Sequence, residues 1–130
     1  MSKIVEKFYK YLKNLGFNDD ILNYEKLKGS EEMLYFYEEN RDGLMFKIAF
    51  VFNDNDVDIF VSKHIESNVP DNSYKIINDL NIKYQNLDFF IVGNAAVIKC
   101  EVGKFESIDF VFDKFALIYY VALNELSAIK

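Results

Sequence analysis

The fold is decided by the stretch LMFKIAFVFNDNDVDIFVSK, residues 44–63. Its first part places a large apolar residue at every second position, namely Leu44, Phe46, Ile48, Phe50 and Phe52. Side chains two positions apart share one face of a strand, so this pattern predicts a strand with one face in the core. The turn sequence NDND follows, and Val57–Lys63 then alternates in the same way. The stretch therefore predicts an antiparallel hairpin with one buried face.

Alternating segments on both sides extend this hairpin into a sheet. Met33–Glu38 precedes it across Asn40-Arg41-Asp42-Gly43, in which glycine after aspartate is a turn signal. Farther along the chain, Asp88–Val92 and Ala95–Val102 flank Gly93-Asn94, a dipeptide typical of tight turns. The sequence therefore predicts five antiparallel strands, three in one group and two in another.

Three segments have the apolar spacing of helices. Lys3–Leu15 carries a single apolar stripe, and Gly16 can end that helix in the left-handed conformation. Tyr74–Tyr84 is a second helix, and Ile108–Ile129 is a third whose apolar residues cover more than one stripe. The residues able to cap the three starts are Ser2, Asp71 or Asn72, and Ser107. A last helix this apolar is either buried on most sides or uses a second face for a partner.

The predicted elements follow the order α-β-β-β-α-β-β-α along residues 1–130. We expect one α+β domain in which the helices pack on one face of the five-stranded antiparallel sheet. The segment Asn18–Ser30 is ambiguous, because it is polar and offers only Ile21, Leu22, Tyr24 and Leu27 as anchors.

Composition excludes several classes of protein. The chain is 51% hydrophobic and 17% aromatic, which argues against intrinsic disorder because burial of this much apolar surface can offset the ordering entropy. Its formal net charge is -6 and Arg41 is its one arginine, which argues against nucleic-acid binding. The longest apolar run, Phe115–Leu123, reaches only about half of the ~20 residues of a membrane span. With a lone cysteine and no apolar leader, we expect a cytoplasmic protein.

The residue types that most often perform chemistry do not form a catalytic pattern. His64 is the single histidine, and it is interpreted as an ordinary residue at a strand end. Cys100 alternates with polar neighbours in a strand and is interpreted as a core residue. The pairs Glu31-Glu32 and Glu38-Glu39 flank the first strand, where they are expected to protect the sheet edge. We therefore expect neither a catalytic residue nor a cofactor.

The aspartates of the second turn are similar to the start of a calcium loop. Asp54, Asp56 and Asp58 alternate as they do there, but the sixth and twelfth positions are Ile59 and Ile65 instead of glycine and glutamate. The interpretation is a hairpin turn with solvated carboxylates, without a metal site.

A group of apolar side chains falls on the strand faces opposite the predicted core. Its members are Tyr35, Tyr37, Met45, Val51 and Phe60. Aromatic residues on a strand face can form an interface with a protein partner or a second copy. They can equally be covered by the second helix or by Asn18–Ser30, and the sequence leaves both alternatives open.

Several segments of the second half resemble the YbjN-like family, also called bacterial sensory transduction regulators, which shares the fold of type III secretion chaperones. The residues that carry the resemblance are Val69-Pro70, Ile77-Asn78-Asp79-Leu80-Asn81, Phe89 or Phe90, and Tyr119-Tyr120-Val121-Ala122-Leu123. The order of elements is also similar over nearly the whole chain. The resemblance implies a small, often dimeric, non-enzymatic binding or chaperone-like domain, although a fold by itself implies little about function.

Two functions from different classes fit these observations. The first is a protein-binding or chaperone-like regulatory module that forms a homodimer. The alternative is a small acidic immunity or inhibitor protein that covers the basic surface of a toxin or enzyme, as the charge of -6 would favour. An enzyme is a third reading, which would require a cleft with convergent polar groups.

Overall fold

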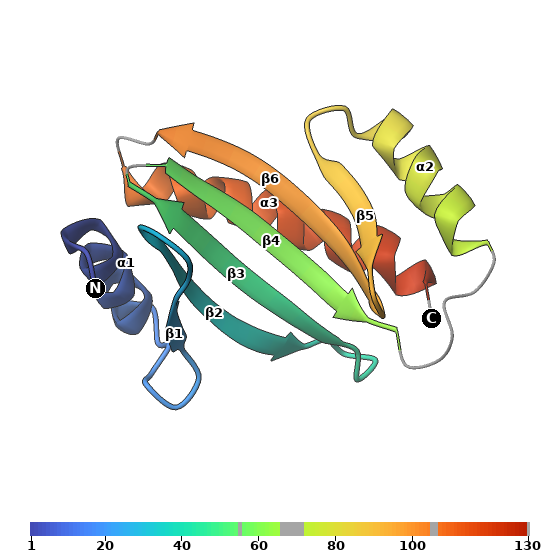
Figure 1. Ribbon diagram of the computed structural model, residues 1–130. Coiled ribbons are helices and arrows are strands. Elements are labelled where there is room, and N and C mark those ends of the chain that lie inside the picture. The colour runs from blue at the N-terminus through green and yellow to red at the C-terminus, as the bar shows by residue number, and fades with distance from the viewer. Residues whose placement is uncertain (55, 66–71, 105–106, 130) are drawn as a thin grey trace.

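The long alternating stretch forms the middle of an antiparallel sheet in the computed structural model, which describes residues 1–54, 56–65, 72–104 and 107–129 (Figure 1). The strands are β1 (Asn23–Lys26), β2 (Glu31–Glu39), β3 (Met45–Asn53), β4 (Asp56–His64), β5 (Asp88–Val92) and β6 (Ala95–Lys104). The helices are α1 (Lys3–Asn14), α2 (Ser73–Lys83) and α3 (Ile108–Glu125), with the short 3-10 turn η1 (Leu126–Ala128) after α3. The predicted α+β class and antiparallel sheet are confirmed.

The predicted number of strands is wrong, because the sheet has six strands in the order β1-β2-β3-β4-β6-β5. The additional strand, β1, lies within the segment that the sequence left ambiguous, and it pairs antiparallel with β2. Only Tyr24 of its four residues is even half-buried. An edge strand this short is held by backbone pairing, so it has no alternating apolar pattern that could have predicted it.

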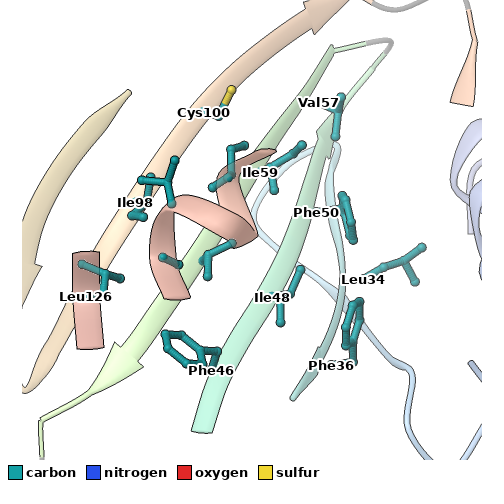
Figure 2. Packing of buried hydrophobic residues seen from close by; sticks show 14 of the residues in the cluster. Leu34, Phe36, Phe46, Ile48, Phe50, Val57, Ile59, Ile98, Cys100 and Leu126 are labelled. Atoms are coloured by element: carbon teal, nitrogen blue, oxygen red, sulfur yellow. The ribbon is translucent and has the colours of Figure 1, made fainter. Parts of the chain in front are cut away.

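One face of the sheet holds the hydrophobic core, as the alternation of residues 44–52 predicts. Figure 2 shows inward-facing side chains from four strands gathered on that face, among them Leu34, Phe36, Phe46, Ile48, Phe50, Val57, Ile59, Ile98 and Cys100. Phe8 of α1 packs against Phe50 and Phe52 of β3, with ring centroids 4.9 and 5.2 Å apart. Phe8 also stacks on Phe112 of α3, so both helices cover this face.

The predicted helix ends are partly confirmed. Ser2 accepts a hydrogen bond from the backbone N–H of Val5, and Ser107 accepts one from Phe110, as N-cap residues do. Gly16 takes the left-handed conformation after α1, with φ of 103°. Asn72 occupies the N-cap position of α2 but makes no capping hydrogen bond with its side chain. The alternative cap, Asp71, and the Val69-Pro70 pair lie outside the described residues.

The expectation that the helices share one face holds for α1 and α3 but not for α2. Asn81 of α2 donates to the backbone carbonyl of Phe89 and accepts from its N–H, both at 2.8 Å. These backbone groups belong to β5, the last strand of the sheet, so α2 lies along the sheet edge (Figure 1). Ile77 and Leu80 of α2 still reach the hydrophobic core. The edge position satisfies backbone groups of β5 that would otherwise lack a partner.

The opposite side of the sheet has no helix packed on it among the described residues, and Figure 1 views the molecule from this side. We call this side the open face. It comprises the side chains of Met33, Tyr35, Tyr37, Met45, Lys47, Ala49, Val51, Asp58, Phe60, Ser62, Phe90, Val92, Val97, Lys99 and Glu101. In the described part of the chain, no helix has the length and apolar character needed to cross a membrane.

Candidate functional site

The five residues predicted to form an interface lie together on the open face. Strand register aligns Tyr35 of β2 with Ala49 of β3, and Ala49 with Phe60 of β4, so the two aromatic side chains flank a small residue. Val51 lies one row away, opposite Met33. Tyr37 and Met45 lie toward the other end, near the β2–β3 turn. The alternation of β2, β3 and β4 therefore brings all five to one surface.

Neither of the two segments considered as covers lies over these residues. The segment Asn18–Ser30 contributes β1, which extends the sheet sideways, and α2 lies along the edge of β5. As a result, Tyr37 and Met45 remain 52% and 48% exposed. Tyr35, Val51 and Phe60 are half-buried. The open face is thus an accessible surface in the single chain.

Two lysines partly shield the aromatic rings of the open face. The Nζ atom of Lys47 lies 4.6 Å from the centroid of the Tyr35 ring, and that of Lys99 lies 5.9 Å from the Phe60 centroid. Lysine stems cover apolar surface while the ammonium group stays in water and interacts with the ring. A partner that displaced these lysines would expose flat aromatic surface for contact.

One end of the open face is acidic. Asp58 lies opposite Glu101 at this end, and Asp56 and Glu31 are close enough to interact with it electrostatically. Burial raises the pKa of Asp58; Lys99 opposes this effect, and the three neighbouring carboxylates reinforce it. The expectation of fully solvated carboxylates is therefore wrong for Asp58, which is half-buried. This end attracts positive charge.

The interpretation of the glutamate pairs requires correction. Glu32 is only 7% exposed, and its carboxylate accepts hydrogen bonds from the backbone N–H of Ser2 and the hydroxyl of Tyr24. Burial raises the pKa of Glu32, but these hydrogen bonds outweigh it and leave the pKa below its usual value. Burial raises the pKa of the Tyr119 phenol to about 12, and the hydrogen bond that this phenol donates to Glu38 adds to the effect. Both glutamates thus join elements instead of only protecting an edge.

A cavity of about 430 Å³ lies beside Glu32. It is lined in part by Ser2, Tyr24, Lys26 and Phe52. A general acid–base residue needs a pKa near the working pH, whereas the carboxylate of Glu32 is held ionised by its donors. Its hydrogen bonds with Ser2 instead let Glu32 anchor the start of α1 to β2.

The remaining candidates lie apart from one another. Cys100 is buried on the core side of β6, opposite Ile59, and burial raises the pKa of its thiol, as the interpretation of a core residue requires. His64 is exposed at the end of β4. Within residues 1–54, 56–65, 72–104 and 107–129, no group of three or more His, Cys, Asp or Glu side chains could hold a metal ion.

The sequence-based prediction of the face omitted part of it. Phe90, Val92 and Val97 belong to the same surface, because β5 and β6 continue the rows of β4. Phe90 lies opposite Val97, and Val97 lies opposite Ser62. Alternation within β5 and β6 would have separated these residues from the core, but the sequence does not show that β6 pairs with β4.

Comparisons with protein-family models, curated proteins and solved structures gave no match for this chain.

Proposed function

We propose that the chain is a non-enzymatic protein-binding module, chaperone-like and regulatory in character, that forms a homodimer through its open face. The observation that carries the proposal is a sheet face that no helix of the described residues covers and that presents aromatic side chains, with Tyr35, Tyr37 and Phe60 among them. Exposed apolar patches of this kind mark interaction sites on soluble proteins. The resemblance to YbjN-like proteins favours the same class of function.

The size of the open face supports an interface between two copies. The open face takes in β2, β3 and β4 with nine residues each, β6 with ten and β5 with five. Each strand residue covers about 16 Å², from about 4.8 Å between strands and about 3.3 Å along a strand. The resulting area of about 700 Å² is close to the ~800 Å² that each partner buries in a standard interface. Two such faces can stack about 10 Å apart, as sheets do in sandwiches.

Light scattering on the purified chain and two lysine variants tests the proposal. The wild-type protein is expected at twice the chain mass of 15.3 kDa. Tyr37→Lys places a charge on an exposed aromatic position of the proposed contact and should give the mass of one chain. Tyr74→Lys is the matched control, because Tyr74 is 63% exposed on α2, away from the open face. A wild-type monomer that binds no other protein would contradict the proposal, as would a dimer that Tyr37→Lys leaves intact.

The acidic end of the open face favours a second candidate, an acidic inhibitor of a basic protein. Asp58 and Glu101 lie side by side there, and the whole chain has a net charge of -6. Complementary charge speeds association and makes it sensitive to salt. On a partner recovered by affinity purification, Asp58→Asn and Glu101→Gln should slow association at low salt. Binding that is insensitive to salt and to both substitutions would exclude this candidate.

A further inference from the structure

The side chains of the open face form rows that cross β2, β3, β4, β6 and β5, the strands seen from this side in Figure 1. The central row consists of Tyr35, Ala49, Phe60, Lys99 and Asp88. On the side of the β2–β3 turn, the lysine row consists of Tyr37, Lys47, Ser62, Val97 and Phe90. On the other side, the acidic row consists of Met33, Val51, Asp58 and Glu101. Apolar side chains occur in all three rows, whereas the two outer rows carry opposite charge.

Lys47 and Asp58 lie inside the open face, and neither forms an ion pair with a described residue. The ammonium group of Lys47 lies over the Tyr35 ring instead of beside a carboxylate. Asp58 is half-buried, and three neighbouring carboxylates add negative charge around it. Lys99, which is also near, already pairs with Glu101 at 3.3 Å. The single chain therefore leaves a positive charge on one side of the central row and a negative charge on the other.

Two copies of the open face can stack with aligned strands in two ways. In a same-end stack, the two-fold axis runs along the strands, and each row meets the same row of the second copy. In an end-swapped stack, the axis runs across the strands at the central row, so the lysine row of one copy meets the acidic row of the other. Both stacks cover about the same apolar surface, so apolar burial does not choose between them.

The charges of the outer rows distinguish the two stacks. A same-end stack brings Asp58 and Glu101 together with their copies and sets Lys47 against Lys47, and like charges that meet at an interface are unfavourable. An end-swapped stack places Lys47 over Val51 of the second copy, next to Asp58, which is the β4 neighbour of Val51. The two-fold axis forms this pair twice.

Two costs accompany the end-swapped stack. Lys47 exchanges its contact with the Tyr35 ring, at 4.6 Å from the centroid, for an ion pair, which leaves the ring free for apolar contact with the second copy. Glu31 and Glu39, at opposite ends of β2, approach each other between copies. They lie at the ends of the strand, where salt and water screen charge, whereas the same-end stack joins like charges inside the contact.

We propose that the second copy stacks on the open face in the end-swapped arrangement, with Lys47 of each copy paired to Asp58 of the other. This inference rests on the homodimer proposed above and adds its orientation. The two central rows meet at the axis, where small Ala49 lies between Tyr35 and Phe60. The pairing gives an opposite charge to the lysine and to the half-buried carboxylate, which both lack one within the single chain.

Reversal of the two charges tests the pairing, with the dimer dissociation constant measured by sedimentation at low salt. Lys47→Glu and Asp58→Lys should each raise this constant at least about tenfold. The variant with both substitutions should return to within about threefold of the wild-type value, because both pairs are then reversed but intact. Lys75→Glu is the matched control, since Lys75 is exposed on α2, away from the open face. Circular dichroism of each variant verifies that the fold is retained.

A distance between the two copies tests the orientation without altering either charge. A nitroxide on His64→Cys marks the end of β4, and His64 is exposed there, four residues from Phe60 of the central row. At about 3.3 Å per residue and about 10 Å between sheets, the end-swapped stack places the two labels about 28 Å apart. The same-end stack places them within about 15 Å. The wild-type chain treated with the same reagent controls for labelling of the buried Cys100.

The outcomes separate the orientation from the homodimer itself. A dimer with the short label distance would overturn the end-swapped stack and leave the homodimer intact. Single charge variants with unchanged dissociation constants, or a double variant that dimerises no better than the single ones, would do the same. A wild-type chain that stays monomeric would overturn the homodimer, and the orientation with it.

Discussion

Ile59 and Phe60 are neighbours on β4 whose side chains point to opposite faces, so their alanine variants test whether the sheet has one buried face. Ile59 is fully buried in the core, opposite Phe50 and Cys100. Phe60 is half-buried on the open face, opposite Ala49 and Lys99. From residue size alone, Phe60→Ala would be expected to lower the free energy of unfolding more than Ile59→Ala does.

The structure reverses that order. Truncation of a buried isoleucine to alanine lowers the free energy of unfolding by about 2–5 kcal/mol, and the complete burial of Ile59 favours about 3–4 kcal/mol. Phe60→Ala removes a half-exposed interaction with Lys99, about 0.5–1 kcal/mol, and a cross-strand contact of about 0.2–1 kcal/mol. We therefore expect about 0.7–2 kcal/mol for Phe60→Ala, at least about 1 kcal/mol less than for Ile59→Ala.

Urea unfolding followed by circular dichroism measures both values, from the shift of the midpoint at constant slope. Measurements at low and high protein concentration separate the chain from a dimer, because association stabilises the folded state by mass action. Phe60→Ala should reduce the dependence on concentration, and Ile59→Ala should not. If Phe60→Ala costs as much as Ile59→Ala at low concentration, the open face is covered within the chain and the reasoning fails.

Three further predictions follow from polar contacts. The pKa of Glu32 is lower in the folded protein than in the unfolded chain. The ionised carboxylate therefore stabilises the fold fully above its ordinary pKa of about 4.3, and this stabilisation is lost as the pH falls through the lowered pKa of the folded state. The Glu32→Gln variant should lack this acid-dependent loss in urea titrations below that pH. Asn81→Leu removes the side chain that binds the backbone N–H and carbonyl of Phe89, so it should lower the free energy of unfolding by about 1–3 kcal/mol. The Phe89 amide should also exchange faster with solvent, and unchanged exchange would contradict the contact between α2 and β5. In an alkaline absorbance titration, Tyr119→Phe should remove the tyrosine that ionises near pH 12, and its persistence would assign that step to another phenol.

Much of the sheet could be predicted from the sequence, since each long strand has large apolar residues at every second position. That period allows only two faces, so it predicts Phe50 and Phe52 in the core and Tyr35 and Phe60 on the other side, as the strand register confirms. The strand β1 escaped prediction, because a four-residue edge strand is held by backbone pairing. Glu32 was misinterpreted for a similar reason: its donors, Ser2 and Tyr24, come from elements whose packing is not local.

By itself, the sequence determined the α+β class, most of the strands and helices, and the division of strand side chains between two faces. These features follow from local periodicity, turn residues and caps. The tertiary structure alone decided that neither α2 nor Asn18–Ser30 covers the open face, because a cover depends on where these two segments pack. It also decided that β5 begins opposite Lys99, so that a groove lies beside α3 next to the rest of β6. Such features depend on the relative lengths and positions of elements distant in the chain, which no local pattern encodes.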